Sequence, residues 1–269
     1  MAIRAVLFDL DGTLWDSSNP DFATATELQI AALSRHLEGL LRCSPAEFVS
    51  RFWESFVQER GRIWEGSELR EIDAISHLAQ TLASHEVPAF DVLAEAVWEA
   101  LSCVPFREFG IRPFPETTRV LSALLDGGIR IAAVTNRTDS ARVIAREFEA
   151  FGFPDGFSAI VTSGDIGYRK PHAAPFEAAL KAVEVHAEEA IFVGDNLDHD
   201  VAGALQVGMT TVLRRGLSIA AVERAGAHHV VDSLDELLPI VFGEPTVSPG
   251  GRASLSGSAT PESGADPRT

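Results

Sequence analysis

Residues 5–14 read Ala-Val-Leu-Phe-Asp-Leu-Asp-Gly-Thr-Leu, an apolar run that stops abruptly at two acids. The apolar half, Ala5 to Phe8, is typical of a strand buried on both faces of a sheet. Asp9 and Asp11 are two positions apart, so on an extended chain both carboxylates point the same way from the strand's carboxyl end. Like charges this close repel one another, and each prefers water. We therefore expect a positive group between them, although Asp-Gly is also a common pair in ordinary turns.

The segment that follows this strand, residues 17–112, has helical periodicity and no convincing strand. Ser44-Pro45-Ala46-Glu47 supplies an N-cap, a proline at the first helical position and the glutamate of a capping box. Aromatic residues such as Phe52 and Trp53 then form a face that predicts packing between helices. We expect four helices, over residues 22–41, from 44 onward, 69–82 and 90–101.

From residue 113 the pattern becomes an alternation of apolar strands and helices. Strands are expected at 129–134, 159–162, 191–193, 210–213 and 228–231, with helices at 116–125, 140–151, 175–183, 201–206 and 234–241. This alternation predicts an α/β fold with a parallel sheet, in which ligands gather at the carboxyl ends of the strands. We predict one sheet domain, residues 1–16 and 113–242, interrupted by the helical segment 17–112. Residues 243–269 are rich in Pro, Gly, Ser and Thr and are predicted to be a disordered tail.

Composition narrows the classes of partner. The 269 residues carry 22 basic and 39 acidic side chains, a net charge of −17, which disfavours nucleic acid and anionic membrane surfaces as partners. A local site for a small phosphate ester is still compatible with this charge. The two cysteines, Cys43 and Cys103, lack the spacing of a zinc site or a disulfide framework. No signal region or membrane span is evident, so a cytoplasmic location is expected, and the oligomeric state is left open.

Three further stretches carry candidate site residues at the ends of predicted strands. Thr135 and Asn136 follow one strand, where a hydroxyl and the next backbone amide can bind an anionic oxygen, although an N-cap looks the same. Lys170 precedes a proline and a predicted helix, and it is one of only two lysines among the 22 basic residues. A solvated loop lysine would be the ordinary interpretation. Asp195 ends a buried strand and Asp200 follows it, whereas Asp198 could simply favour a helix N-terminus.

Taken together, these four stretches resemble the motifs of the haloacid dehalogenase superfamily, in that family's order. Asp-Leu-Asp-Gly-Thr-Leu is similar to its first motif, the strand ending in Thr135 to its second, and Lys170 followed by proline to its third. The Gly-Asp pair at Asp195 with the later acid Asp200 resembles the fourth motif. The resemblance implies a Rossmann-like three-layer sandwich, with residues 17–112 as a helical cap of the C1 type.

The resemblance also implies a chemistry, that of a phosphoric monoester hydrolase with Mg²⁺ as cofactor. Asp9 would attack phosphorus to form an aspartyl phosphate, and Asp11 would serve as general acid and base. Thr135, Asn136 and Lys170 would bind the phosphate. Mg²⁺ would be held by the carboxylates of Asp9 and Asp195 and by the backbone carbonyl of Asp11.

Neighbouring residues are given smaller parts by the same resemblance. Asp200 would support the metal or Lys170 from the next shell of contacts, and Asn196 could also contribute to this site. His199 is expected at the surface rather than as a ligand, and Arg169 as a neighbour of Lys170 only. Arg60 and Arg62, in the helical segment, could reach an anionic substrate, although exposed helix arginines are commoner.

Alternatives remain open at the level of the sequence. A 2-haloacid dehalogenase would need no metal and lacks the second aspartate, so Asp11 disfavours it. A sugar phosphomutase would keep all the motifs, and only its product would distinguish it. A non-catalytic regulatory or binding module would be expected to have lost a motif residue, and none is lost here. The sequence predicts a phosphatase for a small phosphorylated metabolite without naming the ester.

Overall fold

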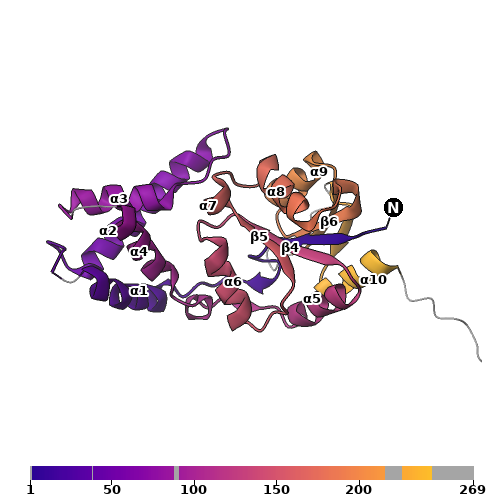
Figure 1. Cartoon of the computed structure of the whole chain (residues 1–269), viewed down its shortest axis with the longest axis horizontal. Helices are drawn as coiled ribbons and strands as arrows, with labels where there is room; N and C mark the ends of the chain where they lie inside the picture. The colour runs from indigo at the N-terminus through magenta and orange to yellow at the C-terminus, as the bar shows by residue number, and fades with distance from the viewer. Residues whose placement is uncertain (1, 38, 88–90, 216–225, 244–269) are drawn as a thin grey trace, which may run out of the picture.

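The computed structural model describes residues 2–37, 39–87, 91–215 and 226–243. Figure 1 shows two groups of elements, a set of helices formed by the first part of the chain and a sheet flanked by helices. The predicted disordered tail lies almost wholly outside the described residues. None of the helices within the described ranges is long and apolar enough to cross a membrane.

The sheet has six parallel strands in the order β5-β4-β1-β6-β7-β8. Their bounds are β1 Ala5–Phe8, β4 Arg130–Thr135, β5 Phe157–Thr162, β6 Ala190–Gly194, β7 Thr210–Arg214 and β8 His229–Val231. All the predicted strands are present, each within two residues of its expected limits. The predicted α/β fold is confirmed, with β1 in the interior of the sheet between β4 and β6.

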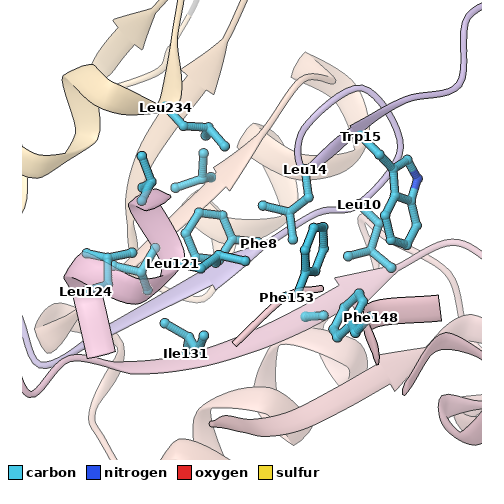
Figure 2. Packing of buried hydrophobic residues seen from close by; sticks show 14 of the residues in the cluster. Phe8, Leu10, Leu14, Trp15, Leu121, Leu124, Ile131, Phe148, Phe153 and Leu234 are labelled. Atoms are coloured by element: carbon cyan, nitrogen blue, oxygen red, sulfur yellow. The ribbon is translucent and has the colours of Figure 1, made fainter. Parts of the chain in front are cut away.

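Helices cover both faces of this sheet, because the strands bury alternate side chains on opposite sides. Val6 and Phe8 of β1 pack in one apolar cluster with α5, α6 and α10, whereas Ala5 and Leu7 pack in another with α8 and α9. Figure 2 shows the first cluster, in which Phe8 lies close to Leu121 and Leu124 of α5. The helices are α5 Thr117–Asp126, α6 Ala141–Ala150, α7 Ser163–Ile166, α8 Ala173–Val183, α9 Ala202–Gln206 and α10 Leu237–Phe242.

The helical segment has a core of its own. Its elements are α1 Phe22–Leu37, α2 Pro45–Glu65, α3 Ala74–Ser84, α4 Asp91–Ser102 and the 3₁₀ turn η1 Phe106–Phe109. Buried residues from α1 to α4 form one apolar cluster that includes Phe48, Phe52 and Leu78. As predicted, Ser44 caps α2, since its side chain accepts a hydrogen bond from the Glu47 amide at 3.2 Å.

Two expectations for this segment were wrong. Its last residue, Arg112, belongs to β3 Arg112–Pro113, which pairs antiparallel with β2 Trp15–Asp16 where the chain leaves and re-enters the sheet domain. The third helix begins at Ala74 rather than at residue 69. Leu69 has a left-handed backbone with φ of 54°, and Asp73 caps the helix by accepting from the Ser76 amide. Apolar periodicity alone does not reveal either feature.

Candidate active site

The topology brings the predicted site residues to one edge of the sheet. Phe8 is in register with Ala133 of β4 and with Val193 of β6, so the residues after these positions meet at the strands' carboxyl ends. A cavity of about 180 Å³ opens there. Its lining includes every predicted catalytic, phosphate-binding and metal residue, namely Asp9, Asp11, Thr135, Asn136, Lys170, Asp195 and Asp200.

A tight turn after Asp9 places the second aspartate. The amides of Thr13, Leu14 and Trp15 all donate to the carbonyl of Leu10, at 2.9 to 3.3 Å. Gly12 sits in this turn with φ of +77°, and a Cβ there would collide with the carboxylate of Asp195. Only glycine satisfies both conditions. The glycine of the first motif therefore makes room for the acid of the fourth.

Lys170 is the positive group beside Asp9, but it lies between Asp9 and Asp200 rather than between Asp9 and Asp11 as expected. It is 2% exposed, and its Nζ lies 2.6 Å from Asp9 Oδ1 and 2.6 Å from Asp200 Oδ1. The Nζ also donates to the carbonyl of Val134 at 2.9 Å. Burial alone would lower the pKa of Lys170, but the charges of Asp200 and Asp9 outweigh it and raise the pKa. The lysine is therefore a permanent cation at this site.

Asn136 holds the lysine by its backbone. Its Oδ1 accepts from the Lys170 amide at 2.7 Å, and its Nδ2 donates to the Lys170 carbonyl at 3.1 Å. The side chain is thus used for positioning, and our assignment of Asn136 to phosphate binding applies to its backbone amide. Thr135 is 2% exposed at the end of β4 and lines the cavity beside it.

Three acids lie close enough to share a cation. One carboxylate oxygen from each of Asp9, Asp195 and Asp200 falls within 4.8 Å of the others. Burial, followed by the charge of Asp200, raises the pKa of Asp195 to about 6. Burial is likewise the main reason that the pKa of Asp9 is raised, with Lys170 opposing it and Asp200 and Asp195 adding to it. One lysine does not neutralise this cluster, and hard carboxylate oxygens suit a divalent cation such as Mg²⁺.

Asp11 faces a partner that the sequence did not reveal, Arg137. The guanidinium binds both carboxylate oxygens: Nε donates to Oδ2 and Nη2 donates to Oδ1, each at 2.7 Å. Trp15 Nε1 also donates to Oδ1, at 2.9 Å. Burial acts to raise the pKa of Asp11, but the charge and hydrogen bonds of Arg137 prevail and lower it. Arg137 directly follows the second motif, and its position next to Asn136 was the only feature of the sequence that could have indicated it as a site residue.

The fourth motif places Asp200 beside Lys170, which is one of the two positions expected for it. Asp200 is buried and belongs to the acidic cluster itself, while its Oδ2 accepts from the Asn196 amide at 3.0 Å. Asn196 uses its side-chain oxygen to cap the following turn, accepting from the amides of Asp198 and His199. His199 is half-buried and lines the cavity, and its assignment as a residue that is not a ligand stays a prediction.

Residues of the helical segment also reach the site. Glu71, whose side chain is fully buried, accepts from Arg60 Nε at 3.2 Å and from Ser163 Oγ at 2.7 Å. Arg60 donates in addition to the carbonyl of Asn136 at 3.0 Å. The sequence had singled out Arg60 but not Glu71 or Ser163. Arg62, the other candidate, is 72% exposed and pairs with Glu59.

A second set of contacts beside Glu71 joins the helical segment to the loop that carries Lys170. The Glu71 amide donates to the carbonyl of Gly167 at 3.0 Å, and the Arg169 amide donates to that of Leu69 at 2.9 Å. The Arg169 side chain is buried and donates to the carbonyl of Trp64 at 2.7 Å. Arg169 is therefore a link between the two halves rather than a mere neighbour of the lysine.

We expect Glu71→Gln to destabilise the protein by about 2 to 3 kcal/mol, because it removes the charge that compensates Arg60 in a buried network. Chemical denaturation followed by circular dichroism would measure the change in the free energy of unfolding. Glu68→Gln is the matched control, since Glu68 is 74% exposed and pairs only with exposed Arg70. Equal stability of the two variants would show that the network contributes nothing.

Comparison with known proteins identifies the family. The model of the haloacid dehalogenase-like hydrolases matches residues 3–208. The chain belongs to this family. A phosphoglycolate phosphatase from Yersinia pseudotuberculosis is 30% identical over 227 residues, which cover 81% of this chain and 86% of the relative. A ribulose-1,5-bisphosphate 5-phosphatase from Halopiger xanaduensis is 28% identical, with 88% of this chain and 98% of the relative covered.

Solved structures of haloacid dehalogenase-like proteins share the fold. A 2-haloacid dehalogenase from Pseudomonas syringae superposes with a TM-score of 0.62 at 26% identity, covering 89% of this chain and 98% of that one. The fold therefore accommodates enzymes with different reactions, and the residues at the strand ends must distinguish them. We expect a dehalogenase to lack the second aspartate of the first motif. This haloacid dehalogenase-like hydrolase has that aspartate, Asp11.

Proposed function

We propose that this enzyme is a Mg²⁺-dependent phosphatase that hydrolyses a small phosphorylated metabolite through an aspartyl phosphate on Asp9. One observation carries the proposal: Lys170 Nζ lies 2.6 Å from both Asp9 and Asp200, where Asp9 and Asp200 also lie close to Asp195. Buried acids gathered around one fixed cation suit a reaction in which negative charge moves onto phosphoryl oxygens. Relatives that cover most of the chain are named as phosphatases of small esters.

In the proposed reaction Asp9 attacks phosphorus with a carboxylate oxygen, and the bond from phosphorus to the ester oxygen breaks. Lys170 fixes the attacking carboxylate by pairing with its Oδ1 and balances charge on the phosphoryl oxygens. Water then attacks phosphorus, and free phosphate leaves as Asp9 is restored. The backbone amide of Asn136 and the hydroxyl of Thr135 are proposed to hold the phosphoryl oxygens.

Asp11 is proposed to protonate the leaving oxygen and later to take a proton from the attacking water. The ion pair with Arg137 favours the ionised form of Asp11, which suits the second task but opposes the first. Arg137 must therefore weaken its hold on Asp11 when the substrate is present. We further propose that residues 17–112 act as a cap, since Arg137 lies at their boundary with the sheet half.

Mg²⁺ is proposed to bind the carboxylates of Asp9 and Asp195 and the backbone carbonyl of Asp11, with Asp200 beside it. Without a second positive charge, a phosphate dianion near Asp9 would cost about 8 kcal/mol, from two charge pairs at ~4 Å and an effective dielectric of about 20. When bound, the metal supplies that charge and stabilises the transferring phosphoryl group.

Removal of the metal should abolish turnover. We expect phosphate release from p-nitrophenyl phosphate and from a panel of sugar phosphates, phosphoglycolate and nucleotides to stop after dialysis against EDTA, and to return when Mg²⁺ is added. Adding EDTA already saturated with Mg²⁺ is the control for the chelator itself. Unchanged activity in the metal-free protein would contradict the proposed cofactor.

The alternatives are separated by their products. With a sugar monophosphate, free phosphate supports the hydrolase and an isomeric sugar phosphate supports a phosphomutase. Release of halide from a 2-haloacid would favour a dehalogenase, and inactivity toward all of these compounds would favour a non-catalytic module. The cytoplasmic location and the absence of nucleic-acid and membrane partners stay predictions from composition.

A further inference from the structure

A second cavity, of about 580 Å³, lies between the helical segment and the sheet half. This volume is within the ~300 to 1,000 Å³ typical of sites for drug-sized ligands. It is more than three times the volume of the acidic cavity, at about 180 Å³. Its walls come from α1, α2, α4, η1 and the loop after β4.

The wall on the helical side is aromatic, and hydrogen bonds fix part of it in place. Trp53 and Trp98 line the cavity, with ring centroids 6.2 Å apart. Trp53 Nε1 donates to Gln29 Oε1 at 2.9 Å, and Gln29 Nε2 donates to the carbonyl of Leu101 at 3.3 Å. The polar atoms of Trp53 and Gln29 are thus used within the wall. What Trp53 presents to the cavity is ring surface.

Two further apolar residues of this wall are exposed. Phe22, at the start of α1, and Val57, on α2, are each 65% exposed, and both line the cavity. Exposed apolar side chains are ordinary when scattered singly, but these two line the same cavity. A ligand bound in the cavity would cover the apolar surface of these two side chains.

The positive charges of the cavity are already compensated. Among the described residues that line it, the cationic side chains are Arg60 and Arg137. Arg60 pairs with Glu71 at 3.2 Å, and Arg137 pairs with Asp11 at 2.7 Å and with Asp139 at 3.4 Å. A leaving group with its own carboxylate, such as the glycolate of phosphoglycolate, would have to compete with Glu71 for Arg60 and, even after Arg137 has released Asp11, with Asp139 for Arg137. An uncharged leaving group needs no ion pair with either arginine, so it could bind in the cavity without displacing these acids.

Arg137 also connects this cavity with the reacting groups. It lines the large cavity, and its guanidinium binds the carboxylate of Asp11, which lines the acidic one. Because Asp11 is the proposed proton donor to the leaving oxygen, the leaving group must extend from Asp11 past Arg137. The large cavity lies beside Arg137 and offers space for such a group.

We propose that the substrate is a phosphate monoester of an uncharged alcohol that carries an aromatic or similarly bulky apolar group, held between Trp53, Trp98, Phe22 and Val57. This inference rests on the proposed phosphatase function and specifies its substrate class. In the reaction a bond forms between Asp9 and phosphorus, the ester P–O bond breaks, and the alcohol leaves with a proton from Asp11. Water later takes the phosphoryl group from Asp9 and releases phosphate, so no other reactant is needed.

The test compares esters whose leaving alcohols have similar acidity, so that binding rather than leaving ability is measured. With the Mg²⁺-loaded full chain, we expect kcat/KM for 3-phenylpropyl phosphate to exceed that for n-propyl phosphate by about 30-fold or more, because the ring is buried against apolar walls. The same excess is expected over phosphoglycolate.

Val57→Glu tests the location of the effect. Since Val57 is 65% exposed, the variant should fold, and the new charge should lower the ratio of kcat/KM for 3-phenylpropyl phosphate to kcat/KM for n-propyl phosphate by about 10-fold. Val92→Glu is the matched control, because Val92 is a 75% exposed valine on α4 that does not line the cavity. It should change neither ester.

The two proposals fail differently. If phosphoglycolate or n-propyl phosphate is hydrolysed as well as 3-phenylpropyl phosphate, the apolar substrate class is overturned while the phosphatase function stands. A preference for the phenyl ester that Val57→Glu leaves intact also overturns the assignment of this cavity. If none of the esters releases phosphate with Mg²⁺, the proposed function fails, and the substrate class fails with it.

Discussion

Asp9→Asn is expected to lower kcat/KM for phosphate ester hydrolysis by at least about 10⁴-fold, the largest effect of any single substitution in this chain. An amide of the same shape is too weak a nucleophile to attack phosphorus in place of the carboxylate. The fold should survive, because Lys170 keeps its ion pair with Asp200 at 2.6 Å. Steady-state release of phosphate, together with the circular dichroism spectrum, would measure both outcomes.

Asp198→Asn is the matched control for this substitution. Asp198 is also an acid of the motif region, but it is exposed and does not line the acidic cavity. It should retain nearly full activity. Rapid acid quenching of the wild-type reaction should also trap a chain heavier by one phosphoryl group, which Asp9→Asn cannot form. Substantial turnover by Asp9→Asn would refute the assignment of the nucleophile.

Lys170→Met is expected to give the second largest effect, a loss of about 10³-fold in kcat/KM. The substitution keeps most of the length of the side chain but removes the cation between Asp9 and Asp200. Three acids would then face one another at low exposure, so the metal-free variant should also be less stable by about 3 kcal/mol or more. Kinetics with saturating Mg²⁺ and thermal melting without it would separate these two losses.

The chain offers an unusually clean control, because it contains only one other lysine. Lys181 is exposed near the end of α8, and Lys181→Met should leave both kinetics and stability as they are. A result in which Lys170→Met and Lys181→Met behave alike would remove the lysine from the proposed mechanism.

The residues at the strand ends could be predicted from the sequence because their signals are local. Asp9 and Asp195 each follow a short apolar run directly, and parallel strands bring such positions to one edge. Lys170 stood out because lysine is rare in this chain. The structure confirms the α/β fold and brings these residues together, while their roles in catalysis stay proposals.

The contacts that were missed are of another kind. Glu71 and Ser163 are 92 positions apart and are ordinary residue types, so nothing in either neighbourhood indicates that they meet. The pairing of Arg137 with Asp11 likewise depends on the turn at Gly12 and on the path of the loop after β4. Long-range polar contacts of this sort are decided by the tertiary structure, and local periodicity does not encode them.

The polar contacts of Glu71 also bear on how this enzyme could be re-engineered. A chimaera that grafts the helical segment of a relative onto this sheet would sever the bond from Ser163 and the backbone pairing beside Gly167. Those contacts end on the loop that leads directly to Lys170. Transplanted helices would therefore leave the lysine poorly seated, unless the graft also carried residues 163–169.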